Sequence, residues 1–152
     1  MSRGSFGWTK RLLTRGRRPL RVDRVRILAI EDDHMIQDFY REFLTELGHT
    51  VLVAKNGREA IALAGTAPDV IILDLGLPDV HGYEVVRTLH ADPKTRDIPI
   101  VIVSGFPLVG AMDLAGVFGV LRKPYDVPLL ERTLERVADA VRQPPLHNSA
   151  TN

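Results

Sequence analysis

Polar and charged side chains directly follow several of the short apolar runs in this chain. The residues in these positions are Glu31, Asp32, Asp33, Asp74, Ser104 and Lys123. Carboxylates gathered at one place repel one another and need a cation, and a site of oxygen ligands suits Mg²⁺. A lysine ammonium and a serine hydroxyl beside them supply a charge and a donor for an anion. The set therefore predicts a site for a divalent metal together with a phosphate-like group.

These residues can act together only if the fold brings the ends of the apolar runs to one place. The expected strands are 25–30, 50–54, 70–73, 100–103 and 117–121. Helical spacing of apolar residues between them predicts helices over 34–47, 56–64, 81–91, 108–115 and 126–141. This alternation predicts an α/β fold, a doubly wound five-stranded parallel sheet with helices on both faces. A flavodoxin-like strand order, 2-1-3-4-5, is expected, with the site at the carboxyl ends of the strands.

Residues that cap helices support these boundaries. The first helix is expected to bury Met35, Phe39 and Phe43 in the core and to leave His34 exposed in its first turn. Asp33 is interpreted as a helix cap rather than a metal ligand. The expected caps are Asp33, Asn56 and Asp126 at N-termini and Gly48 at a C-terminus.

Four sequence blocks resemble the signature blocks of the response-regulator receiver family of two-component systems. They are RILAIEDD at 26–33, IILDLGLPDVHG at 71–82, IPIVIVSG at 98–105 and LRKP at 121–124. Their order and approximate spacing match the family's, and the resemblance covers about residues 25–141. It implies a stand-alone phosphorelay switch, which accepts a phosphoryl group and is not an enzyme in the ordinary sense.

The resemblance also assigns a phosphoacceptor and a metal site. Asp74 matches the acceptor, and Glu31 and Asp32 match the acidic pair that holds Mg²⁺. Asp32 would bind the ion directly, and Glu31 through a water molecule. The backbone carbonyl of Gly76 matches a further metal ligand, two residues after the acceptor.

Two more residues match positions that contact the phosphoryl group in the family. Ser104 matches the residue that hydrogen-bonds this group, and Lys123 matches the lysine that pairs with one of its oxygens. The Lys123–Pro124 peptide bond is typically cis in the family. The implied reaction is an in-line attack of Asp74 on a phosphohistidine, helped by positioning and charge neutralisation.

The chain departs from the family pattern in three places. Val120 lies where a tyrosine or phenylalanine usually reports phosphorylation. The interval from Ser104 to Lys123 is 19 residues, about one helical turn shorter than expected. Gly76 and Phe106 occupy variable rim positions, and neither side chain can orient a water molecule. We therefore expect phosphorylation to act by ordering residues 105–119 rather than by turning a ring.

The charge is unevenly distributed along the 152 residues. Residues 1–26 carry nine basic residues and one acidic residue, a net charge of +8, whereas the remainder has a net charge of −7. We expect a basic N-terminal extension over 1–24, a receiver domain over 25–142 and a flexible tail over 143–152. The extension is interpreted as an electrostatic binding segment, as a solvated tail, or as an artefact of a start at Val22 or Val25. Its deletion is expected to leave folding and phosphorylation intact.

The composition limits the expected binding partners and the cellular location. The chain has no cysteine, which fits a reducing compartment and a cytoplasmic location. The expected partners are a histidine kinase or histidine phosphotransfer protein and an unidentified downstream protein, with no output domain on this chain. We expect neither nucleic acid nor membrane as a partner, because the basic run comes without a recognised binding motif.

Two other functions compete with that of a phosphorelay receiver. A haloacid-dehalogenase-type phosphatase also uses an aspartate nucleophile with Mg²⁺, but it needs a second acid two residues later, where this chain has Gly76. A phosphorylation-independent adaptor with a receiver fold is the alternative that Val120 favours, and the complete acceptor site argues against it.

Overall fold

The computed structural model describes residues 24–105 and 116–143. The strands are β1 (Arg26–Ile30), β2 (Thr50–Ala54), β3 (Val70–Asp74), β4 (Ile100–Ser104) and β5 (Val117–Arg122). The helices are α2 (His34–Glu46), α3 (Gly57–Ala64), α4 (Gly82–Ala91) and α5 (Val127–Arg142). All expected strands and helices within the described residues are present, with ends shifted by at most one residue. The expected helix over 108–115 lies outside the described residues.

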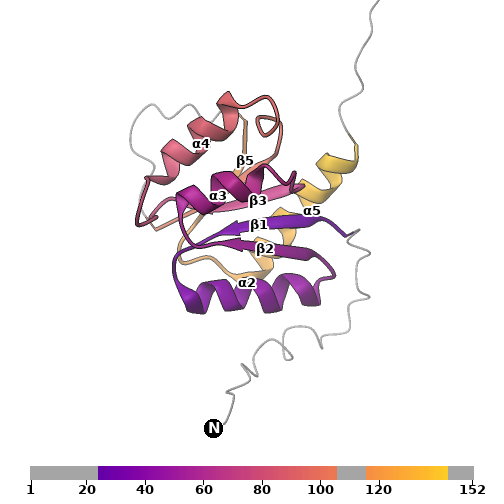
Figure 1. Cartoon of the computed structure of the whole chain (residues 1–152). Coiled ribbons are helices and arrows are strands. Elements are labelled where there is room, and N and C mark those ends of the chain that lie inside the picture. Colours follow the sequence, from indigo (N-terminus) through magenta and orange to yellow (C-terminus); the bar gives the residue numbers. More distant parts are fainter. Residues whose placement is uncertain (1–23, 106–115, 144–152) are drawn as a thin grey trace, which may run out of the picture.

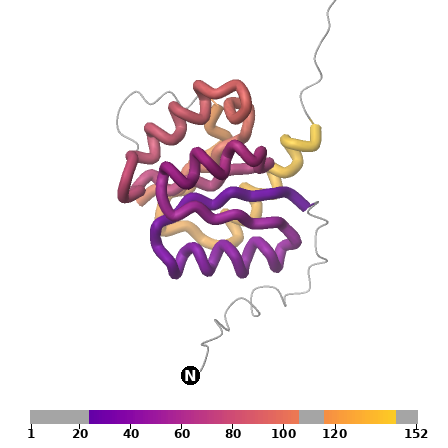
Figure 2. The backbone as a smooth tube through the Cα atoms, in the orientation of Figure 1, coloured from indigo at the N-terminus to yellow at the C-terminus, as the bar shows by residue number. Residues whose placement is uncertain are grey.

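The five strands form one parallel sheet in the order β2-β1-β3-β4-β5, as the sequence predicted. Helices α2 and α5 cover one face, and α3 and α4 cover the other (Figures 1 and 2). Each face has its own apolar core, because successive strand residues point to opposite sides of the sheet. Two covered faces explain why β1, β3 and β4 are apolar along their whole length.

The expected helix caps form as predicted. Asp33 Oδ1 accepts the amides of Met35 and Ile36, at 2.8 and 3.2 Å. Asn56 and Asp126 cap α3 and α5 in the same way. Gly48 follows the end of α2 with a φ of +92°, a conformation that glycine adopts without steric cost.

One core assignment in α2 was wrong. Met35 is 68% exposed, whereas Phe43 is buried and Phe39 packs against the edge of the core. Met35 lies in the first turn of α2, and its side chain faces solvent rather than the core. His34 is exposed, as expected.

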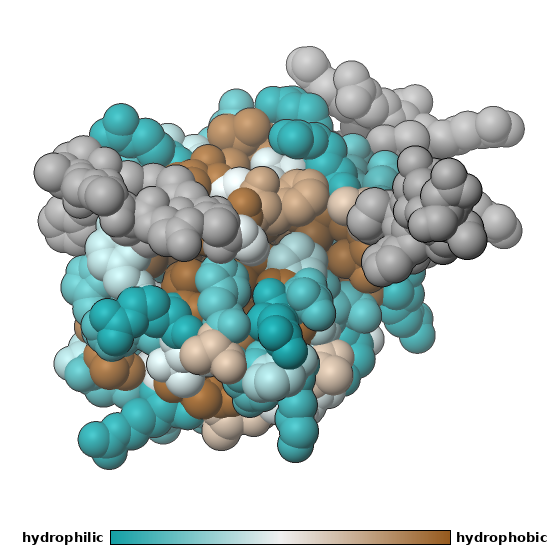
Figure 3. Space-filling model, turned by 90° about the horizontal axis from the view of Figure 1, so that it is seen from above, coloured by the Kyte–Doolittle hydropathy of each residue, from teal (hydrophilic) through white to brown (hydrophobic). Residues whose placement is uncertain are grey.

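The surface of the side covered by α3 and α4 is mixed. Hydrophilic side chains cover much of it, with hydrophobic atoms showing between them (Figure 3). Within the described residues, no helix has the length and apolar character needed to cross a bilayer.

The strand β5 is out of phase with β4 by one residue. Val117 pairs with Ile100, but Gly119 rather than Phe118 pairs with Val101. From there the register is regular, and Ser104 lies opposite Arg122. The extra residue is a β-bulge of the kind that locally re-aims a strand.

A buried histidine at the start of the sheet leads to a pH prediction. His49 is 4% exposed, and its Nδ1 accepts the amide of Val25 at 3.4 Å. Burial lowers the pKa of His49, and the nearby Arg142 lowers it further. The unfolded state therefore binds more protons than the folded state near the unperturbed pKa of about 6.5. Stability is complete above this pH and is lost as the pH falls through it.

We therefore expect lowering the pH from 7.5 to 5.5 to change the free energy of unfolding in urea less favourably for wild type than for His49→Phe, and the difference between the two is the contribution of His49. His34→Gln is the matched control, because it removes an imidazole that is exposed rather than buried. An identical pH dependence in wild type and His49→Phe would show that another group is responsible.

Candidate phosphoacceptor and metal site

The site is built at the carboxyl ends of β1, β3, β4 and β5. Glu31 and Asp32 come directly after β1, Asp74 ends β3, and Ser104 ends β4. Lys123 follows β5, and its backbone amide donates to the carbonyl of Ser104 at 2.8 Å. The parallel sheet therefore gathers the predicted residues at one edge, as expected for this architecture.

Strand alternation sorts these side chains between the two faces. Glu31 and Asp74 are an even number of residues along the chain from strand residues buried in the α2/α5 core, so their side chains lie on that side of the sheet. Ser104 is an even number of residues from strand residues buried in the α3/α4 core, so it lies on the other side. Ser104 is buried, and it does not line the open acidic pocket. The pocket has a volume of about 550 Å³ and is lined by Glu31, Asp32, Asp33, His34, Met35, Ile36, Asp74 and Lys123.

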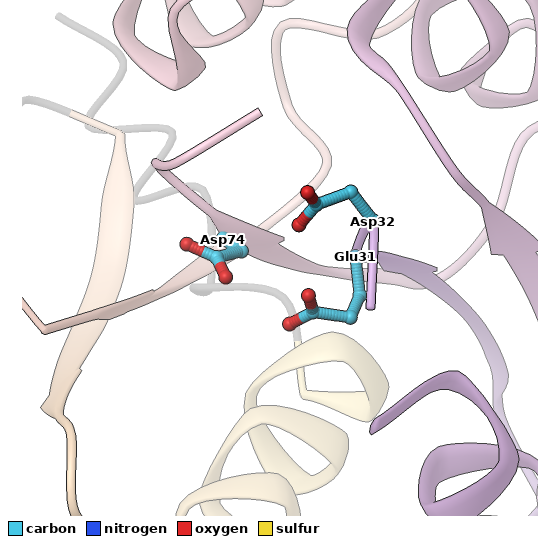
Figure 4. A group of neighbouring side chains, drawn as sticks. All are labelled: Glu31, Asp32 and Asp74. Atoms are coloured by element: carbon cyan, nitrogen blue, oxygen red, sulfur yellow. The ribbon is translucent and has the colours of Figure 1, made fainter. Parts of the chain in front are cut away.

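Three carboxylates converge at the centre of this pocket. One oxygen from each of Glu31, Asp32 and Asp74 lies within 4.8 Å of the others. Their carboxyl groups point toward a shared space from the ends of β1 and β3 (Figure 4). Glu31 is buried, Asp74 is partly buried and Asp32 is exposed, so the site is open to solvent on one side.

Lys123 is the cation that balances part of this charge. Its Nζ lies 2.7 Å from Asp74 Oδ2 and 3.5 Å from Glu31 Oε2. Burial would lower the pKa of Lys123, but the hydrogen bond to Asp74 and the charge of Glu31 outweigh burial and raise it. Lys123 is therefore positively charged at neutral pH.

The acceptor candidate is held as an ionised carboxylate. Burial would raise the pKa of Asp74, but hydrogen bonds from Lys123 and from the amide of Gly76, at 2.9 Å, outweigh it and lower the pKa. Burial raises the pKa of Glu31 to about 7, and the charge of Asp74 adds to the effect of burial. The two neighbouring acids therefore differ in pKa, with that of Asp74 lowered and that of Glu31 raised, so the acceptor candidate is the one held ionised.

The donor set fits Mg²⁺. All three side chains offer hard oxygen ligands, which Mg²⁺ prefers. Glu31 Oε2 is buried and, among the described residues, accepts no hydrogen bond; the ammonium of Lys123, which is hydrogen-bonded to Asp74, lies 3.5 Å from it. A buried carboxylate oxygen in this state is costly unless a cation or a water molecule compensates it. Gly76 lies beside Asp74, where its carbonyl is the predicted fourth protein ligand.

The comparisons with known proteins decide the family. The model of the response regulator receiver domain matches residues 27–135. The chain belongs to the response-regulator receiver family. It is 30% identical over 113 residues to the polar-differentiation response regulator DivK of Brucella anthropi, an alignment that covers 72% of this chain and 92% of that protein.

Solved receiver structures agree with this assignment. The receiver domain of the sensor histidine kinase PA1611 from Pseudomonas aeruginosa, solved with magnesium in its active-site cleft, is 29% identical, with a TM-score of 0.69. The match covers 77% of this chain and 99% of that one. The chemotaxis response regulator CheY4 of Vibrio cholerae is 30% identical, with a TM-score of 0.68 and coverage of 76% and 99%. The chain is thus a two-component receiver domain, a class of protein that acts as a phosphoacceptor.

Sequence reasoning missed the tight packing of one glycine in this receiver. A Cβ on Gly82 would lie 2.6 Å from the Cα and 2.8 Å from the Cδ2 of Leu75, the residue after the acceptor candidate. Glycine therefore lets the start of α4 approach the end of β3 closely. The glycine at the end of the IILDLGLPDVHG block was a signal that could have indicated this contact.

We expect Gly82→Ala to lower the free energy of unfolding by about 1–3 kcal/mol, because the backbone must shift to admit a methyl group. Gly119→Ala is the control, since a Cβ there meets no atom within 4 Å. Urea unfolding measures both variants. Equal stability of Gly82→Ala and wild type would show that the loop after Asp74 is free to adjust.

Proposed function

We propose that this receiver accepts a phosphoryl group on Asp74 from the phosphohistidine of a histidine kinase or histidine phosphotransfer protein. The observation that carries the proposal is the Asp74 carboxylate itself. It is ionised, lies at a strand end within a group of three carboxylates, and is held by Lys123 at 2.7 Å. The receiver domain is proposed to span residues 25–142.

The chemistry is a direct transfer. A carboxylate oxygen of Asp74 forms a bond to phosphorus while the bond between phosphorus and the donor imidazole nitrogen breaks, and the imidazole leaves with that electron pair. Lys123 neutralises charge on the transferred group, and the buried Ser104 side chain would have to turn toward the site to donate a hydrogen bond to one of its oxygens. Because catalysis is mainly positioning, the receiver needs no separate general base for this step.

Mg²⁺ is the proposed cofactor. Glu31, Asp32, Asp74 and the carbonyl of Gly76 would hold the ion. When bound, it offsets the negative charge that would otherwise repel an anionic phosphodonor. The phosphorylated receiver is proposed to signal by contact with a downstream protein.

A labelling experiment tests the proposal. The full chain is incubated with acetyl phosphate and Mg²⁺, and the phosphorylated form is resolved on a Phos-tag gel and located by mass spectrometry. We expect one phosphoryl group on the Asp74 peptide, stable to acid and labile to base as an acyl phosphate is. Absence of any label with either acetyl phosphate or a phosphohistidine donor would refute the proposed function and favour the phosphorylation-independent adaptor.

A further inference from the structure

Two tyrosine hydroxyls meet on the α2/α5 side of the sheet, next to the acidic site. Tyr40 of α2 is 1% exposed, and its hydroxyl lies 3.1 Å from that of Tyr125. Tyr125 lies between β5 and α5, is partly buried, and packs against the same core. This hydrogen bond joins two segments that are 85 residues apart in the sequence.

The Tyr125 end of this bond belongs to the segment that carries Lys123. The amide of Lys123 is fixed to the carbonyl of Ser104 at 2.8 Å. Three residues later, Asp126 caps α5 by accepting the amide of Leu129 at 2.7 Å. Tyr125 therefore anchors the middle of a short segment whose two ends are already tied to the fold.

The Tyr40 end of the bond belongs to a helix that also holds Glu31. Gln37 lies nearly one helical turn before Tyr40 and donates from Nε2 to the carbonyl of Glu31 at 2.7 Å. Glu31 Oε1 in turn accepts the amide of Asp33, the N-cap of the same helix, at 3.0 Å. Helix α2 therefore braces Glu31 directly and Lys123 through the tyrosine pair.

Burial of the two tyrosine hydroxyls costs free energy, because polar groups lose their contact with water. Burial raises the pKa of both Tyr40 and Tyr125, and the nearby acids add to this rise, whereas the mutual hydrogen bond raises the pKa of Tyr40 and lowers that of Tyr125. Two phenylalanines would fill nearly the same volume without desolvating a polar group. The hydrogen bond adds a directional constraint that packing alone does not give.

We propose that the Tyr40–Tyr125 hydroxyl pair is a positioning device that fixes Lys123 relative to Glu31 and Asp74. The inference rests on the proposed function of Asp74 and adds two positioning residues to it. Lys123 must meet the transferred phosphoryl oxygens from a segment outside any strand, and the tyrosine pair sets where that segment lies. Neither tyrosine touches the reacting atoms.

The test compares Tyr40→Phe, Tyr125→Phe and the double variant, all as the full chain. We expect each single variant to be phosphorylated by acetyl phosphate about threefold to tenfold more slowly, the size of effect that one hydrogen bond gives. The apparent affinity for beryllofluoride with Mg²⁺ should fall by a similar factor. The double variant should be no slower than the slower single variant, because both substitutions remove the same bond.

Tyr83→Phe is the matched control. Tyr83 is the remaining one of the chain's three tyrosines and lies in α4, and its ring stacks on that of His81, the N-cap of this helix, with a centroid distance of 4.6 Å. Its rate should equal that of wild type. Unfolding curves confirm that every variant is folded during the rate measurement.

Three outcomes are decisive. Wild-type rates in Tyr40→Phe and Tyr125→Phe would overturn the inference even if both variants lost stability, because the pair would then be structural only. Losses that multiply in the double variant would also overturn it, since the hydroxyls would act separately. Failure of wild type itself to be labelled would instead refute the proposed function.

Discussion

Asp74→Asn is expected to abolish phosphorylation of this receiver. An amide oxygen is a far weaker nucleophile than a carboxylate, and the substitution also removes the charge that Lys123 pairs with at 2.7 Å. The label that acetyl phosphate places on wild type should be undetectable, a loss of at least about a hundredfold if the nucleophile is essential. Phos-tag electrophoresis and mass spectrometry measure the loss.

Asp97→Asn is the control for this substitution. Asp97 is exposed in the loop before β4, at the opposite edge of the sheet from the site. It should be labelled like wild type. Undiminished labelling of Asp74→Asn would show that another residue accepts the phosphoryl group, and a peptide map would then identify it.

Removal of the divalent metal should have an effect of similar size. Glu31, Asp32 and Asp74 present three carboxylates. Lys123 is the only lysine or arginine among the residues that line the pocket. An anionic donor cannot approach such a site while its charge is unbalanced. We expect chelation by EDTA to stop labelling and added Mg²⁺ to restore it.

Asp32→Asn separates this metal effect from a general loss of activity. It removes one of the three charged ligands but leaves the acceptor and its lysine in place. Half-maximal labelling should therefore require a higher Mg²⁺ concentration, while Asp38→Asn, on the exposed part of α2, should leave the requirement unchanged. Equal labelling with and without EDTA would contradict the metal assignment.

The sequence predicted the parallel sheet and the convergence of the site because both follow from local patterns. Continuous apolar strands require a sheet covered on both faces, and parallel strands bring their carboxyl ends to one edge. Asp33, Asn56 and Asp126 cap helices because their side chains reach backbone amides two or three residues away. These contacts are local, so residue type and spacing were sufficient to predict them.

Long-range contacts were not predictable in the same way. The register of α2 with its neighbours leaves Met35 exposed although its spacing is that of a core residue. Tyr40 and Tyr125 have no shared motif, and only the packing of α2 against the segment after β5 brings their hydroxyls together. The distribution of charge within the site also depends on burial, which the sequence does not show. Asp74 is ionised, whereas the pKa of Glu31 is raised to about 7.

The bulge in β5 determines which side of the sheet receives the lysine. Val117 packs toward the α3/α4 core and Phe118 toward the α2/α5 core, yet Val120 returns to the first and Leu121 to the second. Strict alternation would have placed Val120 on the same side as Phe118. The extra residue therefore moves each following side chain of β5 to the opposite face of the sheet from the one that strict alternation would give it. Lys123 thereby shares the parity of Leu121, on the side where Glu31, Asp74 and the two tyrosines lie. A single-residue deletion at Gly119 would therefore restore strict alternation and keep Lys123 on this side, whereas closing the bulge at the present chain length would turn the ammonium group toward α3 and α4.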